Sequence, residues 1–231
     1  MSTESILDKV KKLREITGVG FKDCKAAIEE NKGDIEKSID FLRKKGIAKA
    51  NKKMERVAAE GLVCIEDQDN KISMIEINCE TDFVAKNETF INFAEEISKM
   101  AKESSGKIND ILELKMKNNK NIKENLVEII SKIGEKITLR RYAFLDSNNV
   151  INFSYMHSSI KKNMGKLGVI LSIETNKKKD QIQNFGKQLS MHIAASSPLA
   201  LDKNDLNKQL IKKEKEIINE ELKNSGKKKE I

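Results

Sequence analysis

An internal repeat limits the fold of this chain more than any other feature of its sequence. Each copy of the repeat ends a predicted β-hairpin with Glu-Thr, first at residues 80–81 and again at residues 174–175, and a predicted helix follows. Both helices carry a Phe, an Ile or Leu, a Ser and then a Ser pair at identical spacing: Phe93, Ile97, Ser98, Ser104 and Ser105 in the first, and Phe185, Leu189, Ser190, Ser196 and Ser197 in the second. This shared order predicts a duplicated β-β-α unit and therefore an α+β core with small antiparallel sheets.

The two copies are predicted to differ in their number of strands. Apolar runs and turn residues predict two hairpins with following helices: strands 61–66 and 72–79 around the turn 67–70, then helix 88–103; strands 150–156 and 167–173, then helix 181–195. The first copy continues with a helix over 122–133 and a third strand over 136–145. The second copy has no matching strand, because residues 206–222 carry one apolar stripe typical of an exposed or coiled-coil-like helix. We therefore expect the second hairpin to have an unpaired edge.

Three short helices are predicted before the repeats. Apolar residues recur at helical spacing, with glycines between the runs, over residues 4–16, 21–30 and 35–45. Ser5 or Thr3 can cap the first helix, and Asp34 can cap the third. This pattern predicts a compact three-helix bundle. The next segment, 47–57, is basic and has few large apolar residues, which predicts a solvated helical linker.

Composition excludes several classes of protein. The chain has 44 Lys and Arg against 36 Asp and Glu, a net charge of +8, but the basic excess is spread evenly rather than gathered in one block. Its three Cys form no C-x-x-C motif, and no apolar run approaches the length of a membrane span, so we expect no disulfide scaffold, zinc site or membrane segment and assign the chain to the cytoplasm. No phosphate-binding loop or catalytic triad is present, so we expect neither an enzyme nor a cofactor.

The junction after the first Glu-Thr differs from the junction after the second. Asp82 and Phe83 follow in the first copy, whereas the second copy continues with the polar segment 176–179. Two interpretations of Phe83 are open: it starts the next helix and packs inward, or it is an aromatic side chain presented to a partner beside a carboxylate. Asp82 is also a candidate N-cap.

Several motifs resemble the elongation factor Ts family, the nucleotide-exchange factors of elongation factor Tu. The most specific is the run N-C-E-T-D-F-V-A-K at 78–86, together with T-G-V-G at 17–20 and D-C-K at 23–25. Further matching pieces, in the same order as in the family, are 13–16, 26–27, 31–34, 132–135, 140–141 and 191–196. The resemblance covers roughly residues 5–231.

The resemblance implies a layout and a partner. The layout would be a ubiquitin-associated-like bundle and linker (1–56), core subdomain N (57–146), core subdomain C without its third strand (147–200) and the first helix of a coiled-coil arm (201–231). The partner would be elongation factor Tu, from which the chain would promote GDP release, without covalent chemistry and without direct nucleic-acid binding. By the resemblance, two sets of residues would contact that partner: Thr81, Asp82, Phe83 and Val84, which would disturb its magnesium site, and Lys11, Arg14, Gly20 and Phe21 of the bundle.

Some features remain open. The role of His157 is unassigned, and the segment 158–166 is expected to be a longer and more basic turn than the family usually has. A nucleic-acid- or ribosome-binding basic protein is the main alternative function, because of the net positive charge. A ubiquitin- or peptide-binding adaptor is a third, because residues 18–21 resemble the loop of ubiquitin-associated domains. Oligomeric state is not predicted.

Overall fold

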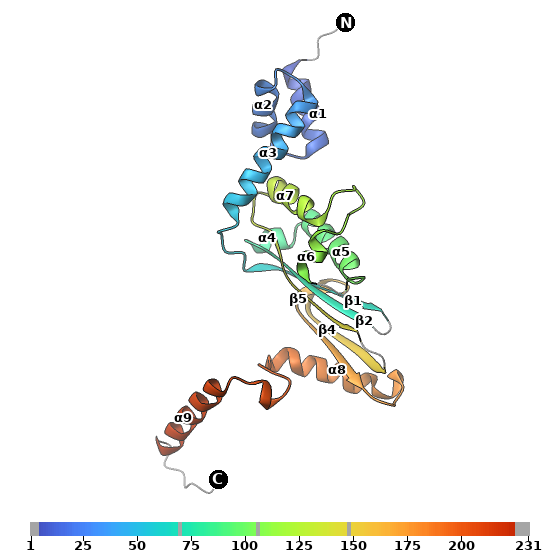
Figure 1. The fold of residues 1–231 in the computed structure, drawn as a ribbon, viewed down its shortest axis with the longest axis vertical. Coiled ribbons are helices and arrows are strands. Elements are labelled where there is room, and N and C mark those ends of the chain that lie inside the picture. The colour runs from blue at the N-terminus through green and yellow to red at the C-terminus, as the bar shows by residue number, and fades with distance from the viewer. Residues whose placement is uncertain (1–4, 69–70, 105–106, 147–148, 225–231) are drawn as a thin grey trace. The chain divides into compact units, whose positions relative to one another are not determined.

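The computed structural model describes residues 5–68, 71–104, 107–146 and 149–224 of the chain (Figure 1). It has two compact units, which divide between Ala194 and Ala195 and are described separately. The first unit contains three N-terminal helices, a mixed α/β core and helix α8. Residues 69–70 of the predicted first turn, Ser105 of the repeat pattern and the end of the chain, 225–231, lie outside the described residues.

The core contains one antiparallel sheet of five strands in the order β3-β2-β1-β5-β4. The strands are β1 (Glu60–Gln68), β2 (Lys71–Cys79), β3 (Thr138–Asp146), β4 (Val150–Lys161) and β5 (Met164–Glu174). Both predicted hairpins are confirmed, with β1 paired to β2 and β4 paired to β5, and β3 adds to β2 as the predicted third strand.

The prediction of separate small sheets is wrong, because β1 and β5 join the two repeats. Val63 pairs with Gly165 and Cys64 with Met164, and the backbone N–H of Ile65 donates to the carbonyl of Asn163 at 2.9 Å. The joint forms because the second hairpin is longer than expected. The expected basic turn over 158–166 consists mostly of strand, which reaches the middle of β1.

Helix α5 (Glu88–Ala101) packs against β1 and β2 and closes the main core. Phe90 and Ile97 of α5 are fully buried in the same cluster as Leu62, Ile75 and Ile77 of the two strands. Helices α6 (Ile108–Leu112) and α7 (Ile122–Ile133) complete this cluster (Figure 1). The apolar positions of α7 were readable from its sequence, and the structure buries them as expected.

The N-terminal helices α1 (Ile6–Thr17), α2 (Phe21–Glu30) and α3 (Ile35–Lys53) pack around a small core of their own. Val10 and Leu13 of α1 lie in this core with Cys24 and Ile28 of α2. As predicted, the Ser5 hydroxyl accepts from the backbone N–H of Asp8, and the Asp34 carboxylate accepts from that of Lys37. The three-helix arrangement is therefore confirmed.

The expected solvated linker is partly wrong, because α3 continues without a break to Lys53 and one side of it is buried. Gly46 and Ala50 face α7, and a Cβ added at Gly46 would come within 2.5 Å of the Ser131 hydroxyl. Arg43 of α3 also bonds Glu124 of α7 at 2.6 Å. Small residues at these positions carry little apolar signal, so only the packing of α3 against α7 identifies the buried side.

Helix α8 (Lys179–Ser196) follows the second hairpin but buries less than α5 does. Gly186 and Ser190 are its buried residues, whereas Phe185, the repeat equivalent of Phe93, is 58% exposed. The second unit contains a short 3₁₀ turn (Lys203–Asp205) and helix α9 (Lys208–Asn224). None of the residues of α9 is buried, and its apolar stripe faces solvent.

Candidate functional site

The most distinctive surface feature is a single helical turn, α4 (Asp82–Ala85), between β2 and α5. Thr81 is its N-cap, and the Thr81 hydroxyl accepts from the backbone N–H of Val84 at 3.4 Å. Asp82 is thus the first residue of the turn and not its cap. The Asp82 carboxylate instead bonds Lys86 at 2.7 Å, and this hydrogen bond holds the pKa of Asp82 below its ordinary value.

Neighbouring side chains of this turn point in opposite directions. Ala85 is fully buried and Val84 packs against the main core, whereas Phe83 is 81% exposed. The inward-packing interpretation of Phe83 is therefore wrong. An aromatic side chain this exposed has lost little contact with water, although its two neighbours hold the backbone firmly. This arrangement is typical of a side chain available to another protein.

A pair of glutamates, Glu80 and Glu135, supports the turn. The Glu135 carboxylate accepts from the backbone N–H groups of Glu80 and Thr81, both at 3.0 Å, and from the Thr81 hydroxyl at 2.6 Å. In the other direction, the Glu80 carboxylate accepts from the backbone N–H of Lys136 at 2.6 Å. We call these four hydrogen bonds the glutamate clamp.

Further contacts keep the clamp in place. The Lys136 amide and then Arg56 hold the pKa of Glu80 below its ordinary value, so Glu80 stays charged. The Cys79 thiol donates to the carbonyl of Thr81 at 3.2 Å, and burial raises the pKa of this thiol to about 12, which keeps it protonated as a donor. In the sequence, Glu135 stands out only as the last residue of the motif 132–135, because the residues that it binds lie 54 and 55 positions earlier in the chain.

The predicted residues of the bundle lie on two successive helices. Lys11 and Arg14 lie one turn apart on α1, Gly20 is the N-cap of α2, and Phe21 is its first residue. All four are exposed, including Phe21 at 44%. Gly18 ends α1 with a φ of 65°, a left-handed conformation that favours glycine and sets the direction of the α1–α2 connection.

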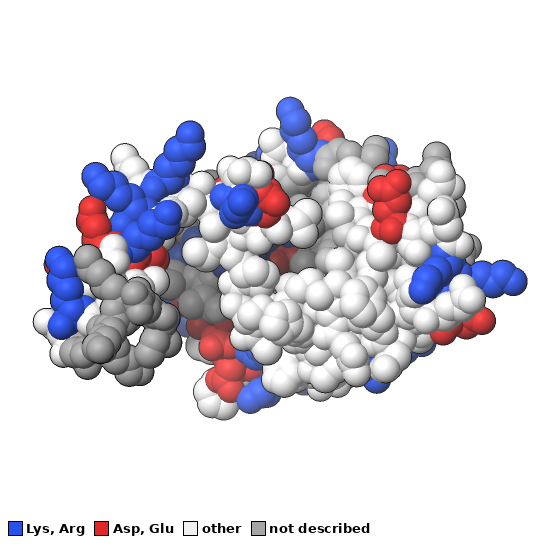
Figure 2. Space-filling view, turned by 90° about the horizontal axis from the view of Figure 1, so that it is seen from below, with Lys and Arg blue, Asp and Glu red and all other residues white. Residues whose placement is uncertain are grey.

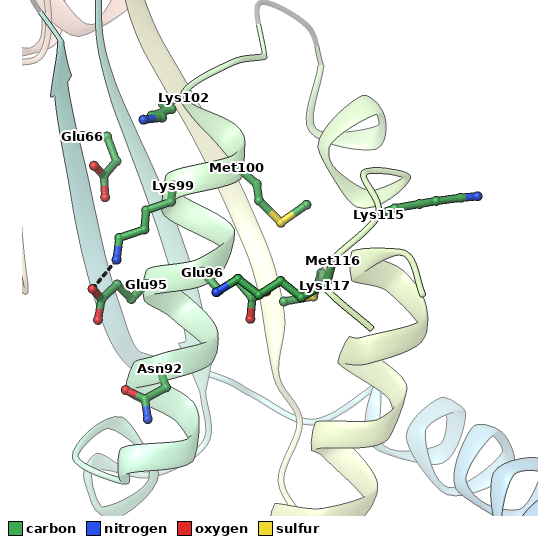
Figure 3. A pocket seen from close by; sticks show the side chains of 10 residues that line it. All are labelled: Glu66, Asn92, Glu95, Glu96, Lys99, Met100, Lys102, Lys115, Met116 and Lys117. Carbon is green, nitrogen blue, oxygen red and sulfur yellow. Dashed lines mark hydrogen bonds and ion pairs between the residues drawn. The ribbon is translucent and has the colours of Figure 1, made fainter. Parts of the chain in front are cut away.

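A surface pocket of about 640 Å³ lies along α5 and contains none of the predicted site residues (Figure 3). Its lining is mixed in charge: Glu66, Asn92, Glu95, Glu96, Lys99, Met100, Lys102, Lys115, Met116 and Lys117. Lys99 bonds Glu95 at 2.6 Å across one helical turn, and Figure 3 shows Lys115 pointing away from the pocket. We assign no chemistry to this pocket.

Charge and metal-binding groups are dispersed. Figure 2 shows Lys and Arg together with Asp and Glu around a broad uncharged area on the face in view. Within residues 5–68, 71–104, 107–146 and 149–224, no group of three His, Cys, Asp or Glu is placed to hold a metal ion. Over the same part of the chain, no helix is long and apolar enough to cross a membrane.

Comparisons with known proteins agree with the motif that contains this turn. The model of the family described as Elongation factor TS matches residues 80–231. The elongation factor Ts of Methylorubrum populi is 42% identical over 219 residues, which is 94% of this chain and 71% of the relative. That of Bartonella henselae is 42% identical over 220 residues, or 95% of this chain and 72% of the relative.

These matches place the chain among the translation elongation factors, proteins of the protein-synthesis machinery. Within that class, the chain belongs to the elongation factor Ts family.

Proposed function

We propose that this chain is a guanine-nucleotide exchange factor that binds elongation factor Tu·GDP and promotes GDP release during translation elongation. The observation that carries the proposal is Phe83, 81% exposed on a turn whose neighbouring residues are anchored in the core. A side chain held this way can enter a partner without unfolding of its own chain. Family membership supports the choice of partner.

The proposed mechanism needs no covalent step and no cofactor. A chain that binds the nucleotide-free GTPase more tightly than the GDP complex weakens GDP binding by the same factor, because the two equilibria are linked. Phe83 and Asp82, flanked by Thr81 and Val84, would contact the nucleotide-binding domain of the partner near its magnesium ion. Lys11, Arg14, Gly20 and Phe21 would provide a second contact through the bundle.

We also propose the domain layout that the resemblance implies. Residues 1–56 would be a ubiquitin-associated-like bundle with its linker, residues 57–146 and 147–200 the two core subdomains, and residues 201–231 the start of a coiled-coil arm. The shared core of α5 with β1 and β2 supports the first subdomain. The exposed apolar stripe of α9 supports the arm, because such a stripe needs a partner helix. We place the action of the chain in the cytoplasm, where translation occurs.

Release of fluorescent GDP from elongation factor Tu tests the proposed function. We expect the chain to accelerate release in proportion to its concentration until the GTPase is saturated. A rate identical to that of spontaneous release, at chain concentrations that saturate binding, would overturn the proposal. Binding to RNA without any effect on GDP release would favour the nucleic-acid alternative instead.

A further inference from the structure

We propose that Glu135 is a positioning residue for exchange: its carboxylate holds the turn that presents Phe83, although Glu135 lies in a different part of the chain. This inference rests on the proposed function. It assigns a role to a side chain that does not belong to either predicted contact set.

The turn needs support from outside itself. Helix α4 contains four residues, and one isolated helical turn is unstable because its first hydrogen bond fixes several residues at once. The hydrogen bond that caps the turn is long, at 3.4 Å from the Val84 nitrogen to the Thr81 hydroxyl. The two bonds that continue the turn, from Ala85 to Thr81 and from Lys86 to Asp82, are both 3.2 Å.

Glu135 provides the shortest contact to the turn. Its carboxylate accepts three hydrogen bonds, and two of them come from Thr81, one from the backbone and one from the hydroxyl. Hydrogen bonds to an ionised acceptor are about twice as strong as neutral ones. The Thr81 hydroxyl donates to Glu135 while it accepts from Val84, so Glu135 also fixes the orientation of the cap.

The position of Glu135 is itself fixed by the fold. Gly134 ends α7 with a φ of 90°, which turns the chain so that Glu135 comes directly after the helix. Lys53 of α3 donates to the carbonyl of Gly134, and Lys136 donates to the carbonyls of Met54 and Arg56 at 2.7 and 2.9 Å. The clamp therefore rests on the joint between the bundle and the core, which can hold the turn in one place.

The role of Glu135 is separable from core stability. Val84 and Ala85 contact the core cluster that contains Phe90, so their packing should persist without Glu135. Loss of Glu135 should free the backbone at Glu80 and Thr81 and let the Phe83 side chain sample several positions. If the Phe83 side chain is mobile, it must be ordered when the chain binds its partner. This ordering lowers the affinity for the nucleotide-free GTPase.

The first experiment compares amide hydrogen exchange in Glu135→Ala and Glu135→Gln. Glu135→Gln is the matched control, since its amide oxygen can still accept the two backbone N–H groups and its NH₂ can face the Thr81 hydroxyl. We expect faster exchange of residues 84–87 in Glu135→Ala, little change in Glu135→Gln and unchanged exchange of residues 71–79 in both. Equal protection of residues 84–87 in Glu135→Ala and the unaltered chain would overturn the proposal.

The second experiment measures GDP release in a double-mutant cycle with Phe83→Leu, which keeps a smaller apolar side chain. In the chain that keeps Phe83, we expect Glu135→Ala to slow GDP release about tenfold. In the Phe83→Leu chain the same change should slow release clearly less, and Glu135→Gln should release GDP at close to the rate of the unaltered chain. An equal loss in both backgrounds would mean that Glu135 does not act through Phe83. If the unaltered chain does not accelerate GDP release from elongation factor Tu, the proposed function fails, but the hydrogen-exchange comparison still decides whether Glu135 holds the turn.

Discussion

The ring of Phe153 in β4 lies directly against Gly186 of α8. A Cβ added at Gly186 would come within 2.5 Å of three ring atoms, and Phe153 is 4% exposed. The contact lies in the second repeat, whose helix buries only Gly186 and Ser190. Helix α8 can thus pack against β4 at this point only because Gly186 has no side chain.

Gly186→Ala should therefore destabilise the chain. Overpacking against a buried ring costs about 1–3 kcal/mol, which exceeds the ~1 kcal/mol that Ala gains over Gly in a helix. Gly20→Ala is the control, because an added Cβ there meets nothing within 4 Å. Urea denaturation measures the free energy of unfolding of both variants. A rescue of Gly186→Ala by the smaller Phe153→Leu would support the packing explanation, and equal stability of the two glycine variants would contradict it.

Phe83→Ala should abolish most exchange activity with little effect on stability. Phe83 is 81% exposed, so its removal deletes little buried surface and should change the free energy of unfolding by less than about 0.5 kcal/mol. Phe90→Ala is a matched control only seven residues away: Phe90 is fully buried, and its loss should cost about 3–5 kcal/mol. Denaturation and GDP release are measured on both. A large stability loss in Phe83→Ala would show that the ring packs inward.

The two repeat junctions should be unequal in function. The first contains α4 and the glutamate clamp, whereas residues 176–178 of the second form no helix. Replacement of residues 176–179 by Gly and Ser should leave the rate of GDP release within about twofold, and the same replacement of residues 82–86 should reduce release to the spontaneous rate. Similar losses from both replacements would argue against a special role for the first junction.

Acid should weaken one contact between the second hairpin and α5. Lys161 at the end of β4, together with Lys99, lowers the pKa of Glu95 from its ordinary 4.5 to about 2. The stabilisation from a lowered carboxyl pKa is complete above pH 4.5 and is lost as the pH falls towards 2. The unfolding free energy of Glu95→Gln should therefore fall less than that of the unaltered chain between these pH values.

The variant Lys161→Met tests the same ion pair, between Lys161 and Glu95, by removing its cation. It removes the largest cause of the lowered pKa of Glu95 and should reproduce part of the Glu95→Gln effect. Urea denaturation at pH 5 and pH 3 compares the three chains under conditions that bracket the ordinary carboxyl pKa. If the unfolding free energy falls equally between pH 5 and pH 3 in the unaltered chain and both variants, the contact between Lys161 and Glu95 does not cause the acid sensitivity.

The free edge of β5 should exchange its amides faster than β2 does. β2 is paired on both sides, to β1 and to β3, whereas β5 pairs with β1 only at Met164 and Gly165 within the described residues. Every second amide over residues 166–174 therefore faces away from β4 without a strand partner, and such amides exchange through small local openings. Hydrogen exchange of residues 166–174 as slow as that of 71–78 would show that another strand, from this chain or a second copy, completes the sheet.

The local elements can be read from the amino-acid sequence. The hairpins, the helices α1, α2, α5 and α7, and the caps at Ser5 and Asp34 depend on apolar spacing and on side chains a few residues apart, which a linear pattern contains. The repeat pattern also predicts that the second copy has no counterpart of β3 after α8. The sequence also distinguishes the junction that contains Asp82 and Phe83 from the junction over 176–179, but it does not determine the direction of the Phe83 side chain.

The way in which these elements join depends on long-range packing. The β1–β5 pairing requires Gly165 to reach Val63, 102 positions earlier, and the buried side of α3 exists only because α7 packs on it. Phe83 is exposed because Val84 and Ala85 take the inward positions and Glu135 holds the cap. Contacts between distant residues depend on register and packing, and these have no periodic signal in the sequence.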